Sequence, residues 1–120
     1  MNIVDGQGWP DMVMLKDDEV NEDGFMKNIL DRFNQKQIYT YIGEQVVAMN
    51  PYTKLNIYGK DTMQGYRNKY LYEVQPHVYA LGDDTFRNLR QRRKDQCVIV
   101  TGTNDLTVCI SAVITVIVGQ

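Results

Sequence analysis

A run of β-branched residues meets a glycine in the stretch QCVIVTGTNDLTVC, residues 96–109. Many phosphate-binding loops begin in this way, because a glycine after a strand lets backbone N–H groups curl around an anion. In this loop, Gly102 is followed by neither a second glycine nor a lysine. The stretch therefore starts like a nucleotide-binding loop but lacks the residues that would hold a polyphosphate.

A second candidate for chemistry is the segment NPYTKLNIY, residues 50–58. Asn50-Pro51 predicts a turn, because proline cannot continue a strand's hydrogen-bond ladder and asparagine favours turns. With its tyrosines and a lysine, such a loop can form the wall of a site for an aromatic ligand. Composition alone makes this a hypothesis, since most Asn-Pro turns bind nothing.

His77 is the only histidine, and no cysteine or carboxylate lies at a metal-ligand spacing from it. The pattern favours a structural role for His77 over a metal site or nucleophilic catalysis. The basic cluster RNLRQRRK, residues 87–94, could contact phosphate or an acidic partner; alternatively, it lies at a helix end, where the dipole and solvent stabilise it. Cys97 and Cys109 are too few for a disulfide framework or a zinc site and indicate a reduced setting.

The elements that position these residues follow from hydrophobic periodicity. Residues 21–34 predict an amphipathic helix capped by Asn21 or Asp23, although Gly24 weakens its first turn. Its apolar positions predict one buried stripe of Phe25, Met26, Ile29, Leu30 and Phe33. Alternation with a period of two predicts a β-hairpin over residues 38–49.

Further helices and a strand follow along the chain. Asp61 is a candidate cap for a short helix that carries Met63 and Tyr66. A stronger helix is predicted to begin at Pro76, since proline is tolerated in a first turn. Its predicted apolar face comprises Val78, Leu81, Phe86 and Leu89. Residues 97–101 predict a buried strand.

The composition limits the class of protein. The chain has 120 residues, of which 43% are hydrophobic and 23% charged, as in an ordinary globular domain. A net charge of −2 argues against a general nucleic-acid or membrane-surface binder. The acidic, irregular opening to Val20 does not resemble a signal peptide. The apolar run 106–118 is shorter than the roughly 18–20 residues of a spanning helix, which makes a membrane role unfavoured but leaves a tail anchor as an alternative.

Three motifs, in order, resemble the head domain of the myosins. They are IYTYIGEQVVAMNPYTKLNIYGKD, YRNKYLYEVQPHVYALGDDTFRNL and KDQCVIVTG, which look like the early motor domain of a class I unconventional myosin. The resemblance covers residues 11–102, with 1–10 as a lead-in and 103–120 as an apolar segment outside the family pattern. It implies an α/β fold, the N-terminal part of a myosin-type P-loop NTPase motor domain. We expect helices, a β-hairpin and one central-sheet strand, with the sheet incomplete.

The resemblance also implies a nucleotide site. In that family the Asn-Pro…Tyr loop lines the purine end of the ATP site, and the matching positions are Asn50, Pro51 and Tyr58. Lys54 lies where the family often has a basic residue near the base and ribose. ATP and Mg²⁺ are the family's cofactors, actin filaments and light chains are its partners, and the cytoplasm and cytoskeleton its location.

At the phosphate loop the resemblance ends. The family continues as ITGESGAGKTE, whereas this chain has VTGTNDLTVCI, with Gly102 as the remnant. Residues 103–109 thus replace the glycines, lysine and threonine that hold phosphates and magnesium, and Asp105 adds a negative charge. We predict a fragment or aberrant product of an actin-based motor, without the switch loops, actin-binding regions, catalytic residues, a metal site or ATPase activity. The alternative is a non-catalytic interaction module that keeps part of the purine pocket.

Overall fold

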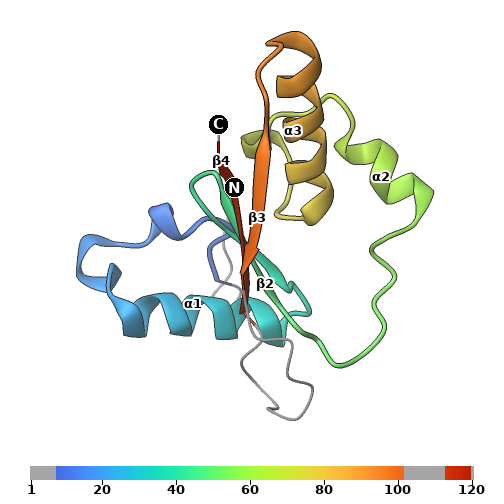
Figure 1. Cartoon of the computed structure of the whole chain (residues 1–120). Coiled ribbons are helices and arrows are strands. Elements are labelled where there is room, and N and C mark those ends of the chain that lie inside the picture. Colours follow the sequence, from blue (N-terminus) through green and yellow to red (C-terminus); the bar gives the residue numbers. More distant parts are fainter. Residues whose placement is uncertain (1–7, 102–112, 120) are drawn as a thin grey trace.

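The computed structural model describes residues 8–101 and 113–119, and its strands form one antiparallel sheet in the order β1-β2-β4-β3 (Figure 1). The helices are α1 (Glu22–Asn34), α2 (Lys60–Tyr66) and α3 (Val78–Gln91). The strands are β1 (Tyr39–Ile42), β2 (Gln45–Met49), β3 (Cys97–Thr101) and β4 (Val113–Gly119). Short 3-10 turns lie at Met12–Met14, Asp17–Glu19 and Leu71–Glu73. The first two give regular structure to part of the opening segment that we expected to be irregular.

The predicted β-hairpin is confirmed. Strands β1 and β2 pair from Tyr39↔Ala48 to Ile42↔Gln45, and Gly43 takes a positive φ of 60° in the turn between them. Alternate residues of a strand point to opposite faces. The hairpin therefore presents one set of side chains to α3 and another to α1.

A separate hydrophobic cluster covers each face of the hairpin. On one face, Tyr39, Tyr41 and Val46 pack with Ala80 and Leu81 of α3. The other face is covered by a cluster of Met12, Ile29 and Val47, in which Ile29 belongs to α1. The two helices lie apart, on different sides of the sheet, in Figure 1. This arrangement leaves the loop after β2 at the edge of the α3 side.

Helix α1 forms where the periodicity predicted it. Asn21 is the cap, since its Oδ1 accepts a hydrogen bond from the Gly24 amide at 2.8 Å. The predicted buried stripe is partly wrong, because Met26 and Leu30 are 55% and 57% exposed. Polar side chains, Asn28 and Arg32, occupy the buried face instead, where they bond to backbone groups of distant segments.

The predicted starts of the next two helices need correction. Asp61 lies in the first turn of α2 and not at its cap, which is Gly59 without a side-chain hydrogen bond. Helix α3 begins at Val78 with His77 as its cap, so Pro76 lies outside the helix. A cap position needs extended backbone and a side-chain acceptor, and His77 provides both.

The predicted apolar face of α3 is also only partly buried. Leu81 is 3% exposed, whereas Val78, Phe86 and Leu89 are at least 36% exposed. The side that packs against the hairpin carries Ala80 next to Leu81. The small side chain of Ala80 allows close approach of helix and sheet, and Val78, Phe86 and Leu89 are left largely exposed.

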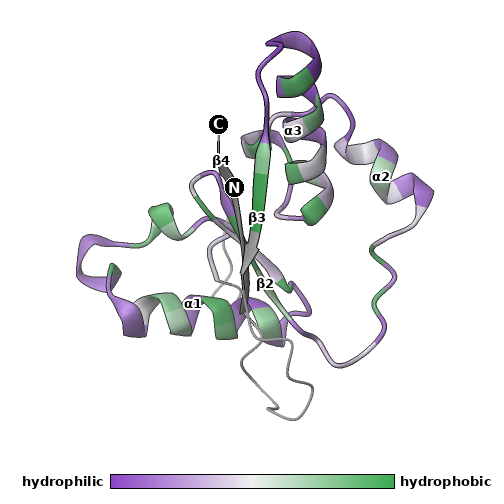
Figure 2. Ribbon diagram, viewed as in Figure 1, coloured by the Kyte–Doolittle hydropathy of each residue, from purple (hydrophilic) through white to green (hydrophobic). Residues whose placement is uncertain are grey.

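Strand β3 confirms the predicted strand but not its burial, since Val98 and Ile99 are 44% and 48% exposed. Figure 2 shows the hydrophobic character of this strand in green. Strand β4 was not predicted as a separate strand. It lies between β2 and β3 and is antiparallel to both, with Val116 opposite Val46 on one side and Val100 on the other. A segment predicted to lie outside the family pattern thus supplies an interior strand of the sheet.

The part of the apolar run 106–118 that the structure describes belongs to β4 and is extended. Across residues 8–101 and 113–119, no helix is long and apolar enough to cross a bilayer. Gly102, the predicted remnant of a phosphate loop, lies outside the described residues.

Candidate functional site

The loop between β2 and α2, residues 50–59, is held in a turn by its own first residue. The Asn50 Oδ1 atom accepts a hydrogen bond from the Tyr52 amide at 2.8 Å, and Tyr52 takes a φ of +51°. This is the turn that an Asn-Pro pair favours. The side-chain carbonyl group of Asn50 therefore stabilises the turn at the start of the loop.

An open groove of about 540 Å³ runs along this loop. Its lining includes three of the predicted purine-side residues, Pro51, Lys54 and Tyr58. The other lining residues are Thr53, Leu55, Asn56, Gly59, Asp61 and Thr62. Asn50, the fourth predicted residue, does not line the groove. The volume lies in the range of small-molecule sites, and the lining offers one cationic, one anionic and one aromatic side chain, those of Lys54, Asp61 and Tyr58.

Tyr58 is held in place at its hydroxyl and at its backbone. The Tyr58 and Tyr39 hydroxyls lie 2.6 Å apart, and the Tyr79 hydroxyl donates to the Tyr58 carbonyl oxygen at 2.8 Å. Burial, followed by the hydrogen bond to Tyr58, raises the pKa of Tyr39 above its ordinary value. Tyr58 is still 48% exposed, so it can offer ring surface to a ligand while its hydroxyl is engaged.

His77 connects the same loop to the start of α3. Its Nδ1 atom accepts from the Tyr79 amide at 2.9 Å, which leaves Nε2 to donate to the Ile57 carbonyl oxygen at 2.8 Å. The rings of Tyr39, Tyr66 and Tyr79 surround the imidazole at centroid distances of 4.4–5.0 Å. The predicted structural role of His77 is confirmed. Its cap position could be read from its place before an apolar run, whereas the bond to Ile57 could not.

Arg32 is a buried residue whose importance the sequence did not reveal. It is 3% exposed and donates to the Tyr39 carbonyl oxygen at 2.9 Å and to the Thr40 hydroxyl at 3.1 Å. Burial lowers its pKa to about 10, because the charged form loses solvation. Among the described residues, it has no ion pair with a carboxylate. Its part in the fold is therefore to fix β1 to α1.

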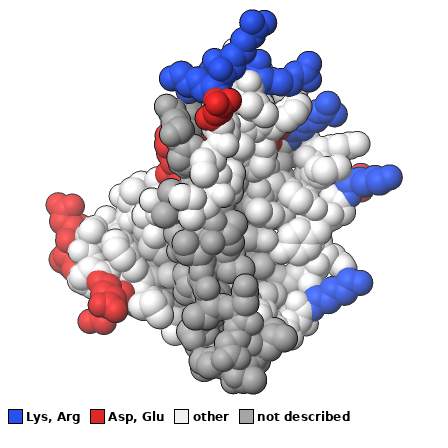
Figure 3. Space-filling view, in the orientation of Figure 1, with Lys and Arg blue, Asp and Glu red and all other residues white. Residues whose placement is uncertain are grey.

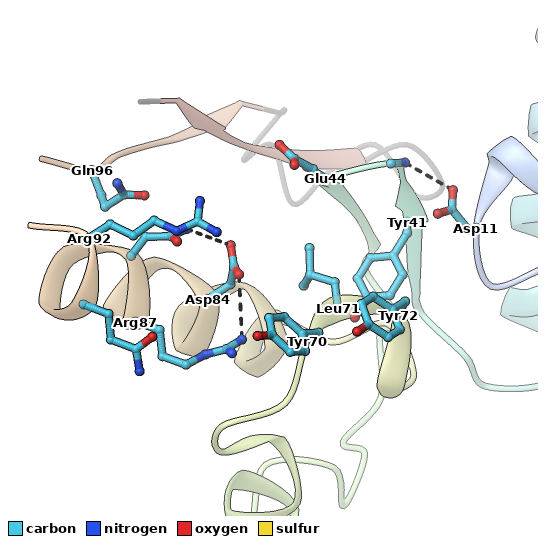
Figure 4. A pocket seen from close by; sticks show the side chains of 13 residues that line it. Asp11, Tyr41, Glu44, Tyr70, Leu71, Tyr72, Asp84, Arg87, Arg92 and Gln96 are labelled. Atoms are coloured by element: carbon cyan, nitrogen blue, oxygen red, sulfur yellow. Dashed lines mark hydrogen bonds and ion pairs between the residues drawn. The ribbon is translucent and has the colours of Figure 1, made fainter. Parts of the chain in front are cut away.

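A second pocket, of about 410 Å³, lies between the hairpin turn and α3 (Figure 4). Arg87 is paired there with Asp83 at 2.9 Å and Asp84 at 3.8 Å, and its guanidinium lies 5.0 Å from the centre of the Tyr70 ring. Acidic side chains of Asp11 and Glu44 also line the pocket. With both signs of charge present, it has no clear preference for an anion. This pocket was not predicted from the sequence.

The rest of the basic cluster gathers at the end of α3 (Figure 3). Arg90 lies in the last turn of the helix, and its guanidinium is 5.7 Å from the centre of the Phe86 ring. The geometry agrees with the helix-end interpretation of residues 87–94, in which cations face the negative end of the dipole. No group of three or more His, Cys, Asp or Glu residues that could hold a metal ion occurs in the described parts of the chain.

The family model for the myosin head (motor domain) matches residues 9–107. The chain belongs to the myosin head family. It is 49% identical over 96 residues to the myosin IF heavy chain of Dictyostelium discoideum, and 45% identical over 95 residues to unconventional myosin-Ib of Homo sapiens. Unconventional myosin-Ic of Gallus gallus is 45% identical over 98 residues. The resemblance to class I myosins is thereby confirmed.

The similarity to these myosins is confined to a small part of each. The matches span 79–82% of this chain but only 8–9% of the relatives' length. The matched part includes the groove along residues 50–59. The matched part is therefore only a small fraction of a myosin heavy chain.

Proposed function

We propose that this chain is an early part of a class I myosin head that keeps the purine side of the nucleotide site and lacks its phosphate side. The observation that carries the proposal is the contrast between two loops. Residues 50–58 place Pro51, Lys54 and Tyr58 along one groove. The sequence after Gly102 has neither the glycines nor the lysine of a P-loop NTPase.

The chemistry of the two loops supports an inactive chain. A purine can lie against the Tyr58 ring, with Lys54 close to the ribose or the first phosphate. Cleavage of the γ-phosphate needs backbone amides, a lysine and a bound Mg²⁺ to stabilise the charge on the transferred group. Residues 103–109 offer none of these in the family pattern, and Asp105 would repel a polyphosphate. Movement on actin, light-chain binding and a cytoskeletal location are properties of the parent family, and the match spans only 8–9% of the relatives' length.

Phosphate release tests the proposed inactivity. The full chain is incubated with MgATP, with and without actin filaments, beside a complete class I myosin head. We expect release from the complete head and none above the blank from this chain. Turnover by this chain that rises with its concentration would overturn the proposal.

We further propose that the departure from the family pattern after Gly102 arose by intron read-through, a frameshift or an incorrectly assigned gene end. The abrupt change from ITG-type sequence to TNDLTVC supports this origin. The genomic sequence tests it directly. We expect an exon that encodes GESGAGKT downstream of the Gly102 codon, and its absence from the locus would contradict this origin.

A second candidate function is a non-catalytic module that binds an adenine nucleoside. It is favoured by the way Tyr58 is fixed, since its hydroxyl and carbonyl are bonded to Tyr39 and Tyr79. Chemical-shift titration with adenosine checks it, with Lys54→Ala as the groove variant and Lys27→Ala on α1 as the control. Shifts at residues 51–59 that Lys54→Ala weakens support the module, and an unchanged spectrum at millimolar adenosine removes it.

A further inference from the structure

A third, smaller pocket, of about 210 Å³, lies where the connection from α1 to β1 meets the loop after β2. Its lining comes from the end of α1 and the residues up to β1, from the loop, from α2 and from the segment just before α3. The volume is below the roughly 300–1,000 Å³ of sites for drug-sized ligands. The pocket therefore suits a small ion and not a nucleotide.

The charged side chains of this pocket have one sign. Arg32 and Lys36 are its cations, and no carboxylate is part of its described lining. The other titratable groups there are the phenols of Tyr39 and Tyr66 and the ring of His77, whose two nitrogens are already bonded within the chain. Unlike the larger pocket between the hairpin turn and α3, this one thus has a preference for an anion.

Arg32 has donors left for such an anion. It is 3% exposed, and its pKa of about 10 keeps it cationic at neutral pH. Its Nε and Nη2 atoms donate to the Tyr39 carbonyl and the Thr40 hydroxyl, whereas Nη1 makes no hydrogen bond with the described residues. A buried cation is costly unless its charge and its donors are satisfied. The dipole of α1 supplies only about half a negative charge at this end of the helix, against two cations in the pocket.

Lys36 lies in a backbone conformation that favours glycine. It takes a φ of 60° just after α1, where its amide donates to the Phe33 carbonyl and the Gln37 amide donates to the Arg32 carbonyl. Glycine takes this conformation at a helix end without steric cost, whereas lysine does not. The backbone thus gives no reason for a lysine here, but the pocket does, because this exposed side chain is its second cation.

We propose that this pocket is a binding site for a small tetrahedral oxyanion, for which inorganic phosphate is the probe, with Arg32 at its base and Lys36 at its mouth. A guanidinium group suits an oxyanion because its planar donors can pair with two oxygens at once. The flexible lysine adds a second charge from the solvent side. The site is separate from the purine groove, although Asn56 and Thr62 line both.

Titration of the full chain with inorganic phosphate, followed by amide chemical shifts at constant ionic strength, tests the site. We expect saturable shifts confined to the residues of the pocket, and no such shifts with chloride. Lys36→Gly is expected to weaken phosphate binding about fivefold, as for one exposed charge pair. The same change is expected to leave the free energy of unfolding equal or higher, since glycine suits this φ. Lys27→Ala, at an exposed lysine of α1, is the control and is expected to leave the phosphate affinity unchanged.

Two results would overturn the site. The first is shifts that rise without saturation or spread over the basic cluster at residues 87–94, because these report screening of surface charge. The second is an equal phosphate affinity of Lys36→Gly and the wild type.

A variant at the base of the pocket gives an independent check. Arg32→Lys keeps the charge with fewer donors and is expected to weaken phosphate binding about tenfold. If this variant does not fold, Lys36→Gly decides. Adenosine binding without phosphate binding would remove only this inference, and phosphate binding without adenosine binding would remove only the purine proposal.

Discussion

At the scale of single residues, polar side chains at buried positions hold the hairpin and the groove in place. Arg32 bridges α1 to β1 through neutral acceptors, and His77 bridges α3 to the loop. Buried polar groups are costly unless their hydrogen bonds are made, so each of these residues fixes one relative position of two segments.

Arg32→Lys tests the bridge between α1 and β1. Lysine has one ammonium in place of a planar fork, so it cannot reproduce the paired contacts to Tyr39 and Thr40. We expect the free energy of unfolding to fall by about 1–3 kcal/mol in urea titrations. Arg90→Lys, at the exposed end of α3, is the matched control and is expected to change it by less than about 0.5 kcal/mol. Equal effects of the two changes would contradict the bridging role.

At the scale of elements, the first turn of α1 shows why a glycine stands where helix propensity disfavours it. A Cβ added to Gly24 would lie 1.8 Å from the Glu19 carbonyl oxygen, so the preceding 3-10 turn leaves no room for a side chain. Gly82 in α3 has no atom within 4 Å of an added Cβ. The two glycines thus have opposite roles in helices of similar length.

Alanine at each glycine tests this difference. Gly24→Ala is expected to lower the unfolding midpoint, because displacement of the turn at Asp17–Glu19 costs about 1–3 kcal/mol, more than the gain in helix propensity. Gly82→Ala is expected to raise stability by about 0.5–1 kcal/mol. Thermal unfolding followed by far-ultraviolet circular dichroism, which reports helix content, measures both. A stabilising Gly24→Ala would show that the turn does not constrain α1.

Local patterns were sufficient to predict α1, the hairpin, α2, α3 and β3. The 3.6-residue and two-residue periods depend on near neighbours, which the sequence contains. The buried faces were harder, because Asn28 and Arg32 bury themselves against backbone groups 7 to 19 residues away. The groove was predicted in part, with Pro51, Lys54 and Tyr58 brought together, whereas its attachment through His77 depends on tertiary contacts that no period reports.

At the scale of the whole molecule, the sheet depends on β4. This strand is the only link in the described sheet between the β1-β2 hairpin and β3. Its sequence, VITVIVG, is rich in β-branched residues, which suit a strand. Apolar residues such as Phe86, Leu89 and Ile99 remain about half exposed, which is consistent with a chain that forms only part of a larger head.

Proline at Thr115 tests the interior position of β4. Thr115 lies opposite Val47 on one side and Thr101 on the other. Proline removes an amide from the ladder and is not tolerated within a sheet, so Thr115→Pro is expected to cost about 3 kcal/mol or more and to promote association through exposed edges. Thr115→Val keeps the backbone donor and is the control, with little change expected. Thermal unfolding measures the loss of stability, and size-exclusion chromatography measures the association. A proline variant that is as stable and as monomeric as the wild type would exclude an interior position for β4.

We propose above all that this chain keeps the purine side of a myosin nucleotide site and lacks its phosphate side. Equilibrium titration with a fluorescent ATP analogue, with and without Mg²⁺, measures this directly, since a phosphate loop gains affinity from the metal. We predict that Mg²⁺ leaves the affinity unchanged and that adenosine competes as well as ATP. Micromolar binding that depends on Mg²⁺ would contradict the claim.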